Sequence, residues 1–148
     1  MNRQVITRSV LYGLLIITAA LDFFSFAIER KFAIFDMSPL TLLTNNLLII
    51  FLVKFGVITG LIYLLTFQQK VSSYWRYLLV MMAVYLILFQ TVGFINNRQV
   101  AKANPPLESA PSTEVRLKTG INFAMIWAYY PIFFSMLCFW LFNLGWED

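Results

Sequence analysis

Four long apolar runs separate the few charged residues of this chain, and they constrain its fold more than any other feature. Of the 148 residues, 60% are hydrophobic and only 12% are charged, and the mean hydropathy is +0.74. A soluble domain usually carries about a quarter charged residues, because its surface faces water. A run of roughly 20 apolar residues crosses the ~30 Å hydrocarbon core of a bilayer as an α-helix. The sequence therefore predicts one integral membrane domain over residues 1–148.

The apolar runs and the residues around them set the expected boundaries. Helices are expected at about residues 9–29, 39–67 (with 47–67 in the membrane), 75–95 and 120–142. Ser38 and Pro39 favour a helix start, because serine caps helices and proline suits the first helical position. The short segment 68–74 predicts a tight turn, and 98–119 predicts a polar, Pro-rich loop. We expect an all-α, up-down bundle of four transmembrane helices with both termini on the same side.

The charged residues indicate which surroundings and which membrane topology to expect. The net charge of +4 favours attraction to anionic lipid head groups. The Lys and Arg residues are too scattered along the chain to predict nucleic-acid binding. A raw count of Lys and Arg favours termini outside, whereas the tight turn and the even number of spans favour termini inside. We expect an integral protein of a prokaryotic cytoplasmic (inner) membrane, with N-in and C-in topology.

The residue types present exclude several kinds of chemistry. The chain has no histidine and one cysteine, Cys138, so histidine-ligated haem and the usual zinc sites lack ligands. An enzyme acting on lipid would have Asp22, Glu29 and Asp36 as acids or bases, but no histidine partner and no nucleophile motif. We expect a non-catalytic protein with no metal and no cofactor. Lipid contacts are expected, and a quinone or pigment contact stays open.

The apolar spans contain one acid and one base, Asp22 and Lys54, at matched depth. Asp22 lies seven residues before Glu29, and Lys54 lies eight residues after Asn46. Each is therefore roughly 10–12 Å inside the same boundary of two antiparallel helices. An unpaired charge at mid-membrane costs about 2.5–3.5 kcal/mol or more. The sequence predicts that Asp22 and Lys54 form an intramembrane ion pair that faces the bundle interior and fixes the register of the two helices.

Further polar residues are expected at the level of this pair. Thr18, Asp22, Ser25 and Glu29 are spaced four, three and four, so they share one helix face. Polar residues of the other runs fall at the same depth, which predicts a polar stripe or vestibule. Its expected members are Thr18, Ser25, Glu29, Asn45, Asn46, Gln90, Thr91, Asn96, Asn97 and Asn122.

Two backbone features complete the prediction. Gly56 and Gly60 form a GxxxG pattern that allows a second helix to approach closely. At about 100° per residue, both glycines project away from Lys54. Pro131 lies inside the fourth apolar run, where it predicts a kink.

The first two predicted helices resemble a small uncharacterised prokaryotic membrane family. Its pattern is an aspartate in the first helix, a Glu-x-Asn-Pro loop and a lysine in the next helix. The counterparts here are Asp22, Asp36-Met37-Ser38-Pro39 and Lys54 within FLVKFG. The resemblance covers residues 10–65 at most, and it departs from the pattern where Asp36 and Ser38 replace Glu and Asn. It implies a shared Asp–Lys architecture and no function.

Two functions fit these features. The first is an accessory, assembly or interaction subunit of a larger membrane complex, with other membrane subunits or further copies of the chain as partners. The alternative is a small oligomeric ion- or proton-linked transporter or sensor that uses the Asp22–Lys54 pair.

Overall fold

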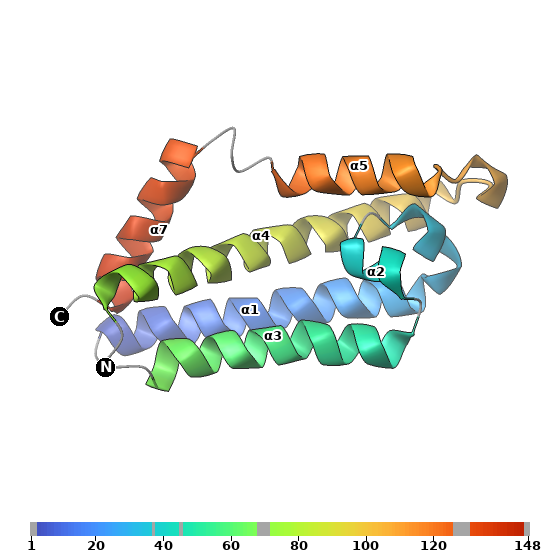
Figure 1. Cartoon of the computed structure of the whole chain (residues 1–148). Helices are drawn as coiled ribbons and strands as arrows, with labels where there is room; N and C mark the ends of the chain where they lie inside the picture. Colours follow the sequence, from blue (N-terminus) through green and yellow to red (C-terminus); the bar gives the residue numbers. More distant parts are fainter. Residues whose placement is uncertain (1–2, 37, 45, 68–71, 126–130, 147–148) are drawn as a thin grey trace.

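All regular elements of the described residues are helical. The computed structural model describes residues 3–36, 38–44, 46–67, 72–125 and 131–146, and no strand occurs among them (Figure 1). The elements are α1 (Arg3–Ile28), η1 (Arg30–Phe35), α2 (Pro39–Leu43), α3 (Leu47–Phe67), α4 (Ser73–Ala103), η2 (Leu107–Ser109), α5 (Thr113–Ala124) and α7 (Pro131–Gly145). Helices α1, α3 and α4 are long and apolar enough to cross a membrane, and Ile132–Gly145 is a shorter apolar helix. The expected count of four spans stays a prediction.

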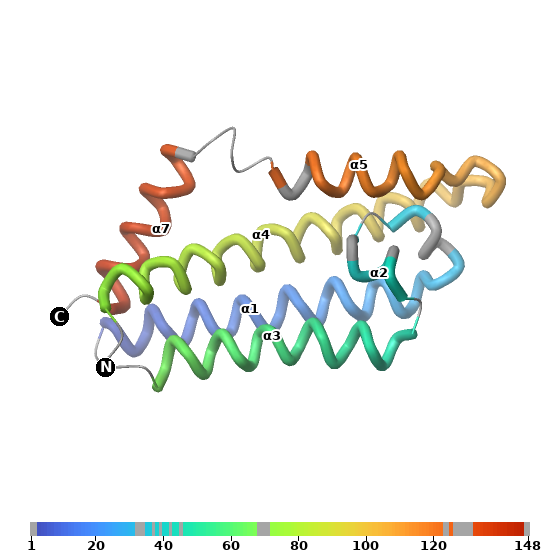
Figure 2. Tube along the Cα trace, in the orientation of Figure 1, coloured from blue at the N-terminus to red at the C-terminus, as the bar shows by residue number. Residues whose placement is uncertain are grey.

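Helix α1 is the centre of the bundle, because it packs against α3, α4 and α7. Figure 2 shows α3 and α4 running beside it over most of its length. The buried residues of α1 recur at intervals of three or four, so they lie on one face of the helix. They meet the buried faces of the other helices in one apolar core: Leu11, Leu15, Ala19, Ile58, Leu61, Leu65, Val80, Ala83, Val84, Cys138, Phe142 and Trp146.

The first turns of α1 meet the end of α7. Arg8 Nε donates a hydrogen bond to the Gly145 carbonyl at 2.6 Å, and the Arg8 guanidinium lies 5.3 Å from the centre of the Trp146 ring. Trp146 is buried, and its Nε1 donates to the Leu65 carbonyl of α3 at 3.4 Å. These contacts bring the two ends of the described chain to the same end of the bundle (Figure 1).

Helix α4 is longer than the predicted span of residues 75–95. It continues to Ala103, and Asn104 ends it in the left-handed conformation with φ 44°. The first proline after the apolar run is Pro105, so nothing in residues 96–103 interrupts the helix. The predicted loop 98–119 is therefore made of the last turns of α4, η2 and the first half of α5.

The predicted helix 39–67 is two helices. Helix α2 ends at Leu43, and Thr44 is extended, with φ −153° and ψ 139°. Helix α3 then begins at Leu47, where Asn46 Oδ1 accepts a hydrogen bond from the Leu48 amide at 3.0 Å. Asparagine is a strong N-cap residue, so a new helix start outcompetes continuation of the first.

The predicted helix 120–142 also differs from the structure. Helix α5 ends at Ala124, residues 126–130 lie outside the described residues, and α7 begins at Pro131. The kink expected at Pro131 depends on the residues just before it, which lie outside the described residues, so it stays a prediction. Helix α5 packs near α2, whereas Tyr77 at the start of α4 donates a hydrogen bond to the Ser135 carbonyl of α7 at 3.2 Å.

Candidate functional site

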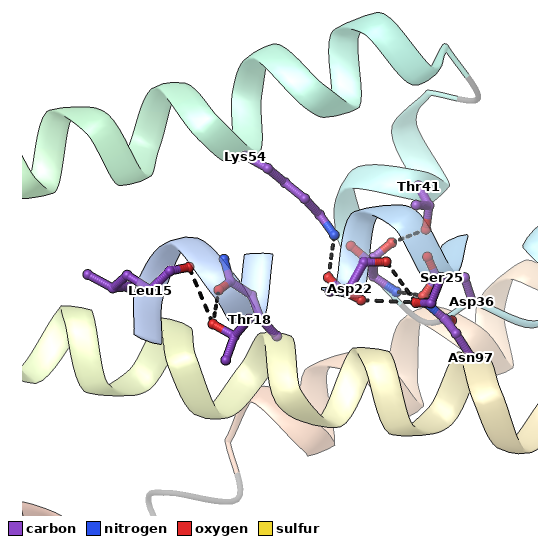
Figure 3. A network of polar contacts seen from close by, with 10 residues as sticks. Leu15, Thr18, Asp22, Ser25, Asp36, Thr41, Lys54 and Asn97 are labelled. Carbon is purple, nitrogen blue, oxygen red and sulfur yellow. Dashed lines mark hydrogen bonds and ion pairs between the residues drawn. The ribbon is translucent and has the colours of Figure 1, made fainter. Parts of the chain in front are cut away.

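The buried face of α1 changes from apolar to polar at Asp22, where three helices meet. Lys54 Nζ of α3 donates a hydrogen bond to Asp22 Oδ2, and the two groups form an ion pair (Figure 3). The two side chains are only 14% and 9% exposed. In an apolar environment this contact compensates two charges that would each be unfavourable alone. The structure thus brings together the two residues that were expected to pair.

The other oxygen of the Asp22 carboxylate faces α4. Asn97 Nδ2 lies 3.5 Å from Asp22 Oδ1 and donates to Ser25 Oγ at 3.1 Å. Ser25 Oγ in turn donates to the Asp22 backbone carbonyl at 2.9 Å. Asp22, Ser25 and Asn97 are all buried. Asp22, Ser25 and Asn97 therefore provide hydrogen-bond partners for one another, as is usual for buried polar groups.

A second polar contact joins the same two helices one turn away. Thr18 Oγ1 lies 2.9 Å from Gln90 Oε1 and 2.8 Å from the Leu14 carbonyl. Gln90 is 5% exposed. Because Thr18 precedes Asp22 by four residues and Gln90 precedes Asn97 by seven, each helix presents its polar residues on one face.

Gly93 is the residue of this site that sequence analysis did not single out. A Cβ added there would lie 2.6 Å from Asp22 Oδ1 and 3.1 Å from Asp22 Cγ. The carboxylate thus lies directly against the backbone of α4, at a position that only glycine leaves open. One signal was available: Gly93 is the only glycine between Ser73 and Ala103, and it falls between Gln90 and Asn97.

The connection between α1 and α3 lies beside the ion pair. Arg116 of α5 donates two hydrogen bonds to the Asp36 backbone carbonyl, from Nε at 2.9 Å and from Nη2 at 2.6 Å. The Ser38 amide donates to Asp36 Oδ1 at 3.1 Å, and Thr41 Oγ1 donates to the Ser38 carbonyl at 2.8 Å. Figure 3 shows Asp36 and Thr41 on the same side of the cluster as Ser25. Arg116 holds this connection in place.

Two cavities border the ion pair. The smaller measures about 90 Å³ and the larger about 300 Å³. Asp22, Ser38 and Phe89 line both of them. The larger also reaches Lys54 and Gln90. The site therefore combines a fixed pair of opposite charges with space for water or a small ligand.

Several predicted members of the polar stripe lie elsewhere. Asn46 caps α3, and Thr91 donates within α4 to the Ile87 carbonyl at 2.7 Å. Asn122 is exposed on α5. Asn45, like Met37 of the expected family pattern, lies outside the described residues. These residues were placed by depth alone, which does not fix the direction in which a side chain points.

The remaining predicted residues are at the edge of the cluster or outside it. Asn96 lines the smaller cavity, and Glu29 lies 4.0 Å from Arg98 in a partly exposed contact. A Cβ added at Gly56 or Gly60 would meet no atom within 4 Å. The two glycines thus pack against no helix of this chain among the described residues, and the expected contact with a helix of a separate chain stays a prediction.

The polar atoms of the site are nitrogen and oxygen atoms. Among the residues that the structure describes, no group of three or more Cys, Asp or Glu side chains lies close enough to hold a metal ion. Lys54, Gln90 and Asn97 supply N–H donors, and Asp22 supplies a carboxylate. This arrangement can bind and orient a polar group between the helices. Comparison of the chain with known protein families, curated proteins and solved structures finds no match.

Replacing Gly93 with alanine should weaken the contact between α1 and α4. The added methyl group collides with the Asp22 carboxylate, and such overpacking costs about 1–3 kcal/mol of unfolding free energy. SDS titration of the purified protein in mixed micelles, followed by tryptophan fluorescence, measures this loss. Gly13→Ala is the matched control, since a Cβ at Gly13 meets nothing within 4 Å. Equal stability of both variants would show that the close approach is absent.

Removing one member of the ion pair should destabilise the bundle more than removing both. Asp22→Asn or Lys54→Met leaves one buried charge without its partner, which costs about 3–5 kcal/mol. The double variant removes both charges and should recover most of that loss in the same SDS titration. Thr91→Val, which alters a hydroxyl that donates within α4, controls for loss of a neighbouring polar group. Simple addition of the two single losses in the double variant would contradict the pairing.

Proposed function

We propose that this chain is a non-catalytic, four-span membrane protein that serves as an accessory, assembly or interaction subunit of a larger membrane complex. In this proposal α3 is the helix that meets the partner. One observation supports it above the others: the face of α3 that carries Gly56 and Gly60 is open, because a Cβ at either position would meet no atom within 4 Å.

The open face lies opposite the bundle. The buried residues of α3 are Ile50, Ile58, Leu61 and Leu65, and Lys54 shares their side of the helix. Around the glycines, Leu52 and Tyr63 are 59% and 57% exposed. Lipid is as apolar as these side chains, so their exposure alone favours no partner. Small residues favour one, because they let two helix backbones approach closely enough for tight packing.

The proposed topology adds a fourth crossing to the three long apolar helices. Ile132–Gly145 is apolar but short, so the rest of this crossing would come from residues before Pro131. Ile132, Phe133 and Met136 are all strongly exposed, which suits contact with lipid or with a partner. In the same proposal the protein lies in a prokaryotic inner membrane, with both termini on the cytoplasmic side.

Substituting the glycines should release the chain from its complex. Gly56→Ile and Gly60→Ile each place a branched side chain on the contact face and keep a partner helix at a distance. Chemical cross-linking in the native membrane, followed by native gel electrophoresis, should show the wild type in a larger assembly and the variants free of it. Gly13→Ile makes the same change on α1, where an added Cβ also meets nothing within 4 Å, and should leave the assembly intact. Recovery of the wild type as a partner-free monomer would refute the proposal.

A second candidate is an ion- or proton-linked transporter or sensor. The observation that favours it is the pair of cavities on the Asp22–Lys54 contact. A charge pair next to space for water can exchange protons or ions, and intramembrane ionisable residues commonly mark such pathways. Four helices enclose little volume, so this function would require an oligomer.

The transport candidate makes its own prediction. Proteoliposomes with wild-type protein should dissipate an imposed proton or sodium gradient faster than empty vesicles. Lys54→Met should lower that rate towards the empty-vesicle value, because it removes the ammonium of the ion pair. Indistinguishable rates for wild type, variant and empty vesicles would eliminate this candidate and leave the subunit proposal intact.

A further inference from the structure

We propose that the larger cavity beside Lys54 binds the head of a neutral amphiphile through its carbonyl oxygens. This cavity measures about 300 Å³, at the lower end of the usual range for small-molecule pockets. It is bordered by residues of α3 and α4, with Asp22 of α1 and two residues of the α1–α3 connection, Ser38 and Leu40. The inference is independent of any partner of α3.

Apolar side chains form most of the cavity wall. Val53, Val57 and Ile58 come from α3, and Leu86 and Phe89 from α4. The rings of Tyr85 and Phe89 stack, with centres 6.0 Å apart and planes 21° apart, and both residues line the cavity. Such a wall suits an apolar or planar group and disfavours a strongly hydrated one.

Lys54 and Gln90 place N–H donors at the cavity. Lys54 has three N–H donors, and Asp22 is the only acceptor that it contacts among the described residues. Gln90 is 95% buried, and its Oε1 lies 2.9 Å from Thr18 Oγ1. The Nε2 amide group of Gln90 has no acceptor among the described residues. A buried donor without an acceptor is unfavourable, so a ligand that fits here brings acceptor oxygens.

The charges at the cavity favour a neutral head. The ammonium of Lys54 is already paired with the carboxylate of Asp22, so the two together contribute no net charge. An anionic head that approached Lys54 would also approach Asp22, and like charges repel. Neutral carbonyl oxygens accept from Lys54 and Gln90 without this repulsion. Quinone rings and the ester groups of neutral lipids both present such oxygens next to an apolar body.

Binding of two neutral probes to the full-length protein tests the proposal. Decylubiquinone carries ring carbonyls and dioctanoylglycerol carries ester carbonyls, and dodecyl maltoside as detergent carries neither. Native mass spectrometry over a range of probe concentrations measures the fraction of protein with one bound probe. We expect saturable binding of one molecule of at least one probe. Binding of decylubiquinone alone identifies a quinone site, and binding of dioctanoylglycerol alone identifies a lipid-ester site.

Two variants and one control locate the binding. Gln90→Leu removes the free donor and should raise Kd about tenfold, the effect of a hydrogen bond of about 1.4 kcal/mol. Val57→Phe narrows the cavity without altering a polar group and should abolish saturation. Thr91→Val should bind as the wild type does, since the Thr91 hydroxyl donates within α4. Failure of both probes to saturate the wild type, or equal binding by Val57→Phe and wild type, would overturn the proposal.

Discussion

The contact between Asp22 and Lys54 is the constraint on which the bundle depends. Either charge alone in the apolar spans is unfavourable by several kcal/mol, so the two helices must rotate until the groups meet. That rotation also determines which faces of α1 and α3 point towards the other helices. It turns Ser25 and Thr18 towards α4, and it turns Gly56 away from the bundle.

Helix α4 contributes to the site in two ways, through a position without a side chain and through its polar side chains. Gly93 has no side chain, so the Asp22 carboxylate can lie against the α4 backbone. Asn97 then approaches Asp22 Oδ1 and Ser25 from one side, and Gln90 lies near Thr18 on the other. The larger cavity lies beside these groups, and Asp22 and Gln90 line it together with residues of α3.

The sequence predicted the parts of the structure that follow from charge and periodicity. Hydropathy predicted the three long apolar helices, and matched depth predicted that Asp22 would meet Lys54. Depth does not determine side-chain direction, so Asn46, Thr91 and Asn122 were placed in the cluster without belonging to it. The break at Thr44 depended on the competition between two helix starts, which no count of apolar residues reveals.

Helix α4 is longer than a crossing of the hydrocarbon core requires. Its 31 residues rise about 46 Å at ~1.5 Å per residue, whereas a hydrocarbon core is about 30 Å thick. Where α4 spans a membrane, several of its turns therefore stand outside the core, and the end that carries Arg98 and Lys102 reaches water. Because α4 is one continuous helix, this charged end and the segment that supports the Asp22 carboxylate belong to the same element.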